Sequence, residues 1–281
     1  CYSVVKDLIA ADAWGESHED RLNKLYRGGL IIHTTLDTGK QQAAYESVTT
    51  NVPVNDPSGV EMAMSSVEPG TGKIVAMVQN TNYCSATAED PNATTVNLNA
   101  GMTRGGGQGF QSGSTFKVYT LIEWIRSGRS LEERVDASRD EYAREDWTIS
   151  CAPDLADAYN PSNIEGIGSG MMTVLESTRK SVNLSFIDMA AQLDLCNITG
   201  VAAQMGVETG NGDPLLPRPS SVLGSNNVTP LSTANSMATL ASGGIMCEPM
   251  AFTKIESQNG DVIAEVSPSC TRVLDEEVAD T

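Results

Sequence analysis

The apolar positions of the chain recur at two spacings, one typical of helices and one typical of strands. Val118, Leu121, Ile122 and Ile125 recur three and four residues apart and predict a helix, with Gly128 just past its last turn. Further helical patterns cover 172–178, 184–193, 197–207 and 230–241. Short β-branched or alternating runs predict strands at 30–36, 60–64, 73–78, 251–257 and 262–266. Asn259-Gly260 predicts a hairpin turn between the last two runs, so the chain combines helices with antiparallel strands.

Turn-forming residues suggest one division of the chain. Asp37 is expected to cap a helix that carries Ala44 and Val48, and a loop rich in Pro, Asn, Asp and Gly follows at 51–59. Residues 1–28 mix charged and apolar positions as a short helix and a linker would. We therefore expect 1–51 to be a linker region that follows an upstream domain outside this sequence. Residues 52–281 then form the main domain.

Charge and hydropathy narrow the classes of partner. The 281 residues carry a formal net charge of −18, which disfavours nucleic acid and anionic membrane surfaces as partners. No apolar run of 18 residues is present, so no membrane span is expected. Residues 1–10 lack the pattern of a signal peptide. The sequence therefore resembles an ectodomain excised from a longer protein.

Six cysteines and two histidines bound the redox and metal chemistry. The cysteines show no C-x-x-C spacing, which argues against a zinc ribbon or a thioredoxin-like site. Their even number fits disulfides in an oxidising compartment, although reduced core cysteines fit as well. The hairpin about Asn259-Gly260 brings Cys247 opposite Cys270, and we expect them to form a disulfide. We also expect a disulfide between Cys151 and Cys196, because only loops separate Cys151 from the helices around the second cysteine. No partner is assigned to Cys1 or Cys84.

His18 and His33 have no neighbours in the sequence that suggest a Ser-His-Asp triad or a metal site. Both are interpreted as structural, and neither a cofactor nor a metal is implied.

A hydroxyl and an amine stand one turn apart where a glycine-rich loop, 105–113, meets the helix predicted from residue 118. One interpretation makes Ser114 an N-cap and Lys117 a solvated lysine. The other makes Ser114 a nucleophile whose proton is taken by Lys117, if burial lowers the pKa of the amine. The same Ser-x-x-Lys spacing recurs at Ser177 and Lys180. Only Ser114 follows a flexible loop and opens a helix with an apolar face.

These residues carry a family resemblance. Gly113-Ser114-Thr115-Phe116-Lys117 resembles the active-site segment of the penicillin-binding proteins, specifically the transpeptidase domain of the class A, bifunctional, actinobacterial-like type. Residues 29–37 are similar to the segment that joins the two enzymatic domains of that class. Residues 223–244 are similar to buried helices of its all-α subdomain.

A second motif of this family takes the form Ser-x-Asn, and Ser181-Val182-Asn183 matches it in a polar break between two predicted helices. The alternative interpretation is a helix–helix turn with a capping serine. Ser225-Asn226-Asn227 and Ser257-Gln258-Asn259 match the same short pattern. The distance from Ser114 and the flanking residues favour Ser181 and Asn183.

The resemblance implies an α+β fold of the penicillin-binding-protein and β-lactamase type: an antiparallel sheet flanked by helices, plus an all-α subdomain that carries both motifs. It also implies a D,D-transpeptidase that crosslinks peptidoglycan stem peptides. Ser114 would be acylated by a D-Ala-D-Ala donor or a β-lactam, and Lys117 would be its base. Ser181 would relay the proton to the leaving amine, and Asn183 would hold the lysine and the substrate carbonyl. The expected location is the extracytoplasmic face of the cell membrane, with an N-terminal anchor outside this sequence.

Two alternatives remain open: a hydrolase of the D,D-carboxypeptidase or β-lactamase type, and a non-catalytic β-lactam sensor or binding module. Ser-Val-Asn in place of Ser-Asp-Asn weighs against the hydrolase. The third family motif, Lys-Thr-Gly, is not in the sequence, and the resemblance places it on a later strand of the central sheet. We therefore expect 52–281 to be the N-terminal portion of its domain, to have the remaining C-terminal segment as a partner, and to be inactive or impaired alone.

Overall fold

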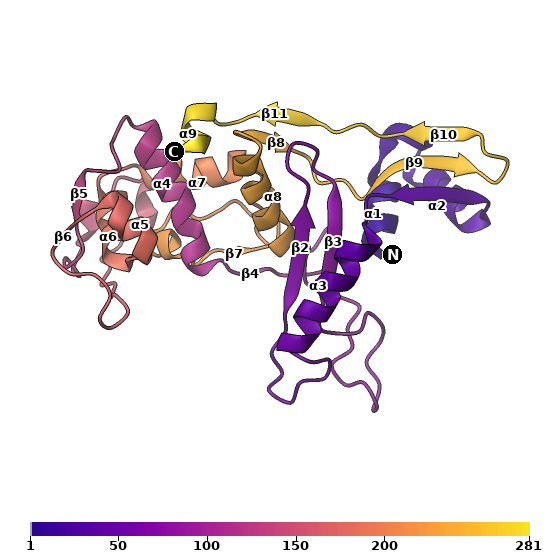
Figure 1. Ribbon diagram of the computed structural model, residues 1–281, viewed down its shortest axis with the longest axis horizontal. Coiled ribbons are helices and arrows are strands. Elements are labelled where there is room, and N and C mark those ends of the chain that lie inside the picture. The colour runs from indigo at the N-terminus through magenta and orange to yellow at the C-terminus, as the bar shows by residue number, and fades with distance from the viewer. Residues whose placement is uncertain (1) are drawn as a thin grey trace.

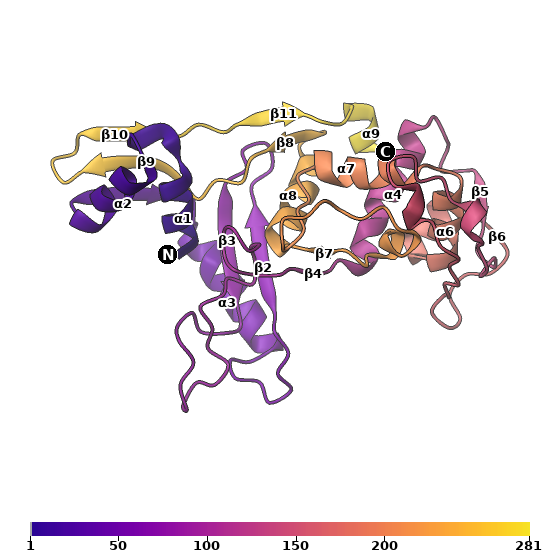
Figure 2. The same cartoon turned by 180° about the vertical axis from the view of Figure 1, so that it is seen from behind.

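The computed structural model describes the backbone of residues 2–281 and the side chains from residue 4 onward. Three regions follow one another along the longest axis (Figure 1). A three-stranded sheet with two helices lies at one end, a β-hairpin with a long helix lies in the middle, and a mostly helical lobe lies at the other end. The view from behind shows the same order (Figure 2). The expected combination of helices with antiparallel strands is confirmed.

The first region combines the N-terminal segment with the hairpin of residues 252–265. Its antiparallel sheet has the order β1-β9-β10, and its helices pack around Leu8, Trp14 and Ile255, all of which are buried. The elements are α1 (Tyr2–Ala10), the 3₁₀ turn η1 (Asp12–Trp14), α2 (His18–Arg27), β1 (Leu30–Thr34), β9 (Phe252–Ser257) and β10 (Val262–Glu265). The β9–β10 hairpin was predicted. The pairing of Leu30 with Ser257 was not, because nothing local specifies a partner so distant in sequence.

Residues 1–28 differ from their prediction of one short helix and a linker. Residues 2–27 form two helices joined by a short turn, and Trp14 and Arg21 are almost fully buried there. Trp14 Nε1 donates to the carbonyl of Leu8, and Arg21 Nε donates to that of Ile9, both at 2.7 Å. The long side chains thus fold the segment on itself, which charge composition alone does not reveal.

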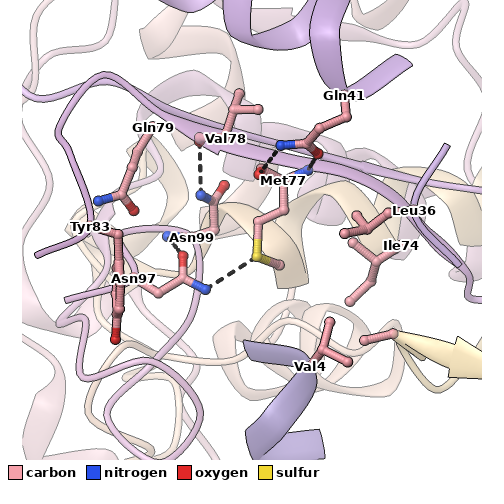
Figure 3. A pocket seen from close by; sticks show the side chains of 11 residues that line it. Val4, Leu36, Gln41, Ile74, Met77, Val78, Gln79, Tyr83, Asn97 and Asn99 are labelled. Atoms are coloured by element: carbon pink, nitrogen blue, oxygen red, sulfur yellow. Dashed lines mark hydrogen bonds between the residues drawn. The ribbon is translucent and has the colours of Figure 1, made fainter. Parts of the chain in front are cut away.

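The middle region is a hairpin covered by helices. It comprises α3 (Thr38–Asn51), β2 (Ala63–Val67) and β3 (Ile74–Gln79). Asp37 caps α3 by accepting from the amide of Lys40 at 2.9 Å, as predicted. The side chain of Gln41 bonds both the N–H and the C=O of Met77, so α3 is fixed to β3. The helix α8 (Pro230–Ala241) packs against β2, and a cavity of about 390 Å³ lies beside β3 (Figure 3).

The helical lobe holds the largest core. Its helices are α4 (Lys117–Arg126), α5 (Val174–Lys180), α6 (Asn183–Ala191), α7 (Leu195–Gln204) and α9 (Glu276–Asp280). Short antiparallel pairs join its loops: β4 (Phe110–Gln111) with β7 (Asn227–Val228), β5 (Arg134–Asp136) with β6 (Met171–Thr173), and β8 (Ile245–Cys247) with β11 (Cys270–Arg272). The loops of this lobe also contain the short 3₁₀ turns η3 (Arg144–Asp146), η4 (Pro153–Leu155) and η5 (Pro219–Leu223), and η2 (Gly113–Phe116) precedes α4.

The central helix α4 is buried more widely than its apolar stripe predicts. Val118, Leu121 and Ile125 are only partly buried, whereas Tyr119, Thr120 and Trp124 on other faces are almost completely buried. Neighbouring helices surround α4, so its polar and aromatic positions also enter the core. The structure thus makes α4 a central helix, where the sequence pattern predicts a helix with a single apolar face.

Both predicted disulfides are present. Cys247 and Cys270 face each other where β8 pairs with β11, and Cys151 is bonded to Cys196 at the start of α7. Cys84 is exposed and is not in a disulfide; Cys1 lies outside the described residues.

Two further observations concern the membrane and the expected division at residue 51. Within residues 2–281, no helix combines the length and the apolar character that a membrane span requires. The β1–β9 pairing crosses the expected division, which stays a prediction.

Candidate active site

The turn that carries Ser114 is built from close backbone contacts. The segment Phe110–Gln111 pairs with Asn227–Val228, and the amide of Gly113 bonds the carbonyl of Gly224. Gly224 has a φ of +88°, and a Cβ there would collide with the backbone of Gly113. Only glycine fits such a close approach in a left-handed conformation. The residues that fix this turn therefore lie more than a hundred positions downstream.

Ser114 lies inside the 3₁₀ turn η2 (Gly113–Phe116) that leads directly into α4. Its side chain does not cap either helix, and the residue is exposed. The interpretation of Ser114 as an N-cap is therefore wrong. Phe116, two residues later, is completely buried, which contributes roughly 1.5–3 kcal/mol and anchors the turn. Ser114 is thus an exposed hydroxyl on a firmly held turn.

Lys117 is not a solvated lysine. The residue is 3% exposed, and burial lowers the pKa of its amine from 10.5 to about 8. Its Nζ lies 2.7 Å from the carbonyl oxygen of Ser181, 2.7 Å from Oδ1 of Asn183 and 3.1 Å from Oγ of Ser181. Nζ also lies 5.4 Å from the centre of the Phe186 ring. The amine of one predicted motif is therefore in contact with both polar residues of the other.

The second motif occupies the junction between α5 and α6. Ser181 ends α5 in a left-handed conformation, with φ 51° and ψ 45°. Such a backbone costs of order 1–3 kcal/mol for a residue with a Cβ and persists only when its surroundings enforce it. Val182, which follows, is completely buried, and its amide bonds the carbonyl of Ser177. Asn183 then begins α6 and points its amide at Lys117.

The other Ser-x-x-Lys sequence has no comparable geometry. Ser177 is completely buried, and its hydroxyl donates to Ser185 at 2.8 Å. Lys180 is exposed and pairs with Glu176 on the same helix. Ser177 can therefore not meet a ligand from solution without rearrangement of the core.

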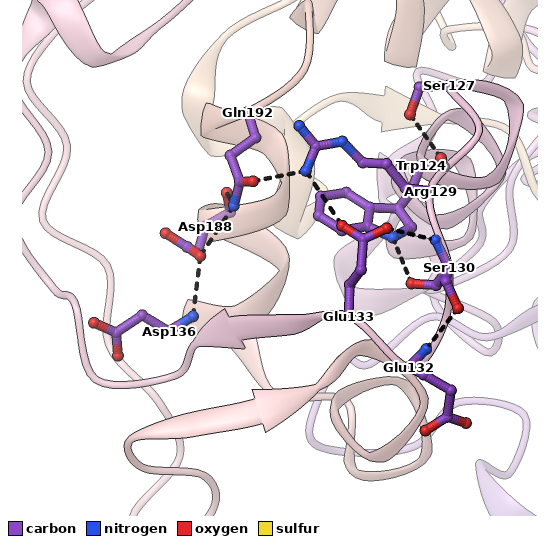
Figure 4. Close-up of polar contacts among 9 residues, drawn as sticks. All are labelled: Trp124, Ser127, Arg129, Ser130, Glu132, Glu133, Asp136, Asp188 and Gln192. Carbon is purple, nitrogen blue, oxygen red and sulfur yellow. Dashed lines mark hydrogen bonds and ion pairs between the residues drawn. The ribbon is translucent and has the colours of Figure 1, made fainter.

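Polar contacts join α4 and the loop after it to the end of α6 and to β5 (Figure 4). The guanidinium of Arg129 stacks 4.4 Å from the Trp124 ring and donates to Gln192. Gln192 in turn donates to Asp188, which accepts from the backbone amide of Asp136 on β5. These contacts connect the C-terminal parts of the two helices whose first residues are Lys117 and Asn183. Sequence reasoning missed the Arg129–Gln192 and Asp136–Asp188 contacts, because their partners are separated by more than fifty positions.

Residues 161–168 show no helix or strand pattern in the sequence. In the structure the carbonyl of Ser162 accepts from Asn183 Nδ2 at 2.9 Å. The side chain of Asn163 accepts from the amide of Leu184 at 2.9 Å. No local pattern in the sequence predicts either contact. Among residues 2–281, no three His, Cys, Asp or Glu side chains gather as metal ligands would.

Comparisons with known proteins identify the family of this chain. Residues 62–281 match the family described as the penicillin binding protein transpeptidase domain. The chain is 28% identical over 253 residues to penicillin-binding protein 1A of Mycobacterium tuberculosis. The matched segment covers 85% of this chain and 27% of that protein. It is 25% identical over 252 residues to penicillin-binding protein 2D of Bacillus subtilis, with coverages of 89% and 32%. The chain thus spans a third or less of the length of these relatives.

Solved structures show the same fold. The PonA1 protein of Mycobacterium tuberculosis in complex with penicillin V has a TM-score of 0.70 and 25% identity, covering 91% of this chain and 62% of that one. Penicillin-binding protein A of the same organism, as an imipenem acyl-enzyme complex, has a TM-score of 0.69 and 20% identity, with coverages of 92% and 64%. With a family match over more than three quarters of its length, the chain belongs to the penicillin-binding protein transpeptidase domain family.

Proposed function

We propose that Ser114 is the nucleophile of a D,D-transpeptidase and that Lys117 is its base. The observation that carries this proposal is the buried amine of Lys117, one turn after an exposed serine and held by Ser181 and Asn183. Burial favours the neutral amine, the form that can accept a proton.

The two kinds of oxygen around Nζ support a proton path. The Ser181 carbonyl and Asn183 Oδ1 only accept hydrogen bonds, so they take two N–H bonds of Lys117 whether the amine is charged or neutral. The third neighbour, Ser181 Oγ, is a hydroxyl and can also donate. When Lys117 is neutral, its lone pair is then available to a hydroxyl. Ser181 thus suits a relay between Lys117 and the leaving amine.

The proposed reaction is acyl transfer in two steps. The Ser114 oxygen bonds to the penultimate D-Ala carbonyl of a peptidoglycan stem peptide as its proton passes to Lys117. The C–N bond then breaks, and D-Ala leaves with a proton delivered through Ser181. In the second step an amine of a neighbouring stem peptide attacks the ester and gives up one proton, which passes to the Ser114 oxygen as the C–O bond breaks, so Ser114 is released and the crosslink forms. A β-lactam would acylate Ser114 by opening its ring. Because peptidoglycan is crosslinked outside the cytoplasm, the proposed location of the site is the extracytoplasmic face of the cell membrane.

We propose further that a segment outside residues 1–281 completes the substrate-binding site. The hairpin β2–β3 forms a two-stranded sheet in the described part of the chain, and a hollow of about 340 Å³ lies beside Ala63–Ser65 and Phe110–Ser112. The hydroxyl of Ser112 is buried at this hollow without a hydrogen-bond partner. A strand along β2 would cover the hollow and supply polar backbone groups to the substrate. Its Lys-Thr-Gly motif is expected from the family resemblance.

The test is labelling of the full-length protein with fluorescent penicillin, followed by mapping of the labelled peptide. We expect wild type to be labelled at Ser114 and Ser114→Ala to remain unlabelled. Ser177→Ala, the matched change in the other Ser-x-x-Lys sequence, should still be labelled in its folded fraction. Label on another residue, or undiminished label on Ser114→Ala, would refute the assignment. Crosslinking of a stem-peptide donor to an added amine then separates transfer from hydrolysis and from a sensor that never turns over.

A further inference from the structure

The loop of residues 161–168 contacts three consecutive residues at the start of α6: Val182, Asn183 and Leu184. The Ser162 carbonyl accepts from Asn183, and Oδ1 of Asn163 accepts from the amide of Leu184. Gly168, with a φ of +79°, packs so tightly on Val182 that a Cβ would collide with it. No part of this loop belongs to either catalytic motif.

The Ser162 contact decides which end of the Asn183 amide faces Lys117. A carbonyl oxygen can only accept a hydrogen bond, so it requires the NH₂ end of Asn183. The amide carbonyl Oδ1 is then left to accept from Lys117 at 2.7 Å. If the amide were reversed, two donors would face each other at Lys117 and two acceptors at Ser162. One backbone carbonyl therefore fixes the orientation of the residue that holds the base.

Asn163 holds that carbonyl in place. Its Nδ2 donates to the carbonyls of Gly168 at 3.2 Å and Ala137 at 2.9 Å, which closes the loop and ties it to the end of β5. Its Oδ1 bonds the amide of Leu184 in the first turn of α6. The N-cap of α6 is Val182, whose side chain cannot cap, so Asn163 satisfies one of the helix's free N–H groups from 21 positions upstream.

We propose that Asn163 is a positioning residue for the transpeptidase site: it sets the Ser162 carbonyl, which orients Asn183 toward Lys117. This inference rests on the proposed function. Asn163 does not touch the reacting atoms, and its effect on the reaction passes through Asn183. Loss of its three hydrogen bonds frees the loop and allows the Asn183 amide to rotate away from the lysine. A displacement of about 1 Å at a reacting group can lower a rate by about 10²-fold.

The experiment is a double-mutant cycle on the acylation rate constant of the full-length protein with a chromogenic β-lactam. Asn163→Ala should lower this constant by about 10²-fold. In an Asn183→Ala background the same change should have less than about a twofold further effect, because both residues act through one contact. A role in folding alone would reduce the active fraction equally in both backgrounds. Equal reductions in the two backgrounds, or wild-type acylation by Asn163→Ala, would overturn the proposal.

The matched control is Asn80→Ala. The side chain of Asn80 also accepts from one backbone amide and donates to one backbone carbonyl across a loop, at Met62 and Val60, and it has no contact with the site. This variant should lose thermal stability and keep the acylation rate constant of its folded fraction. If Asn163→Ala does not fold, Asn163→Asp enters the same cycle, because it keeps the acceptor for Leu184 and loses both donated bonds. Wild type that is not acylated at Ser114 would refute the proposed function itself, a result that no Asn163 variant can produce.

Discussion

The burial of Lys117 predicts the pH dependence of acylation. A base must be neutral to act, and burial lowers the pKa of this amine from 10.5 to about 8. At pH 7 a lysine with a pKa of about 8 is neutral in about one molecule in eleven, whereas an ordinary lysine is neutral in about one in three thousand. The roughly 300-fold difference lies within the 10²–10⁴-fold contribution typical of general bases. The acylation rate should therefore rise about tenfold per pH unit below pH 7 and level off above about pH 8.

The assay is the acylation rate constant of the full-length protein with a β-lactam, measured in short reactions between pH 6 and pH 10. Lys117→Ala should lower the rate by about 10²–10⁴-fold and remove the rise with pH. Lys117→Arg keeps a positive charge at every pH and should be equally inactive. Lys180→Ala is the matched control, because this exposed lysine has the same spacing from a serine. If the acylation rate constant of the wild-type protein does not change between pH 6 and pH 9, the assignment of Lys117 as base is refuted.

The same lowered pKa has a defined effect on stability. Unfolded protein keeps the Lys117 proton up to the ordinary pKa of 10.5, whereas folded protein releases it near pH 8. The unfolded state therefore binds more protons between pH 8 and pH 10.5, and the contribution of this group to stability rises with pH across that window. The test is the free energy of unfolding of wild type and Lys117→Met, measured in urea at pH 8 and pH 10. The stability of wild type relative to the variant should be greater at pH 10 than at pH 8. An equal difference in unfolding free energy at both values would contradict the burial of the amine.

Further predictions concern the turn and the disulfides. Gly224→Ala should slow acylation because the new Cβ collides with Gly113, whereas Gly212→Ala, also left-handed with φ +83° but with open space around it, should only lose stability; equal acylation rates in the two variants would contradict this. Cys247→Ser should lower the unfolding free energy by about 3 kcal/mol, because the bond to Cys270 closes a short loop. Denaturant unfolding under non-reducing conditions measures it, and an unchanged midpoint would show that the bond does not constrain the unfolded chain.

The sequence determined the local elements and the identity of the motif residues. Asp37 caps its helix as its side-chain chemistry predicts, and Asn259-Gly260 turns the hairpin. These signals are local, because each depends on hydrogen bonds between residues a few positions apart. The Ser-x-x-Lys and Ser-x-Asn patterns selected Ser114, Lys117, Ser181 and Asn183, whose catalytic roles remain predictions. Sequence spacing could not exclude Ser177, because its burial is a property of the folded core.

Only the tertiary structure decided how those residues meet. The contact between Lys117 and Asn183 joins two helices that are 66 positions apart, and its orientation is fixed by a carbonyl at residue 162 in a loop with no recognisable motif. Likewise, β1 finds its partner more than two hundred positions later. The burial that lowers the pKa of Lys117 exists only once α4 is enclosed by its neighbours. Hydrogen-bond orientation and desolvation both depend on groups that the fold assembles from distant parts of the chain, so no local pattern encodes them.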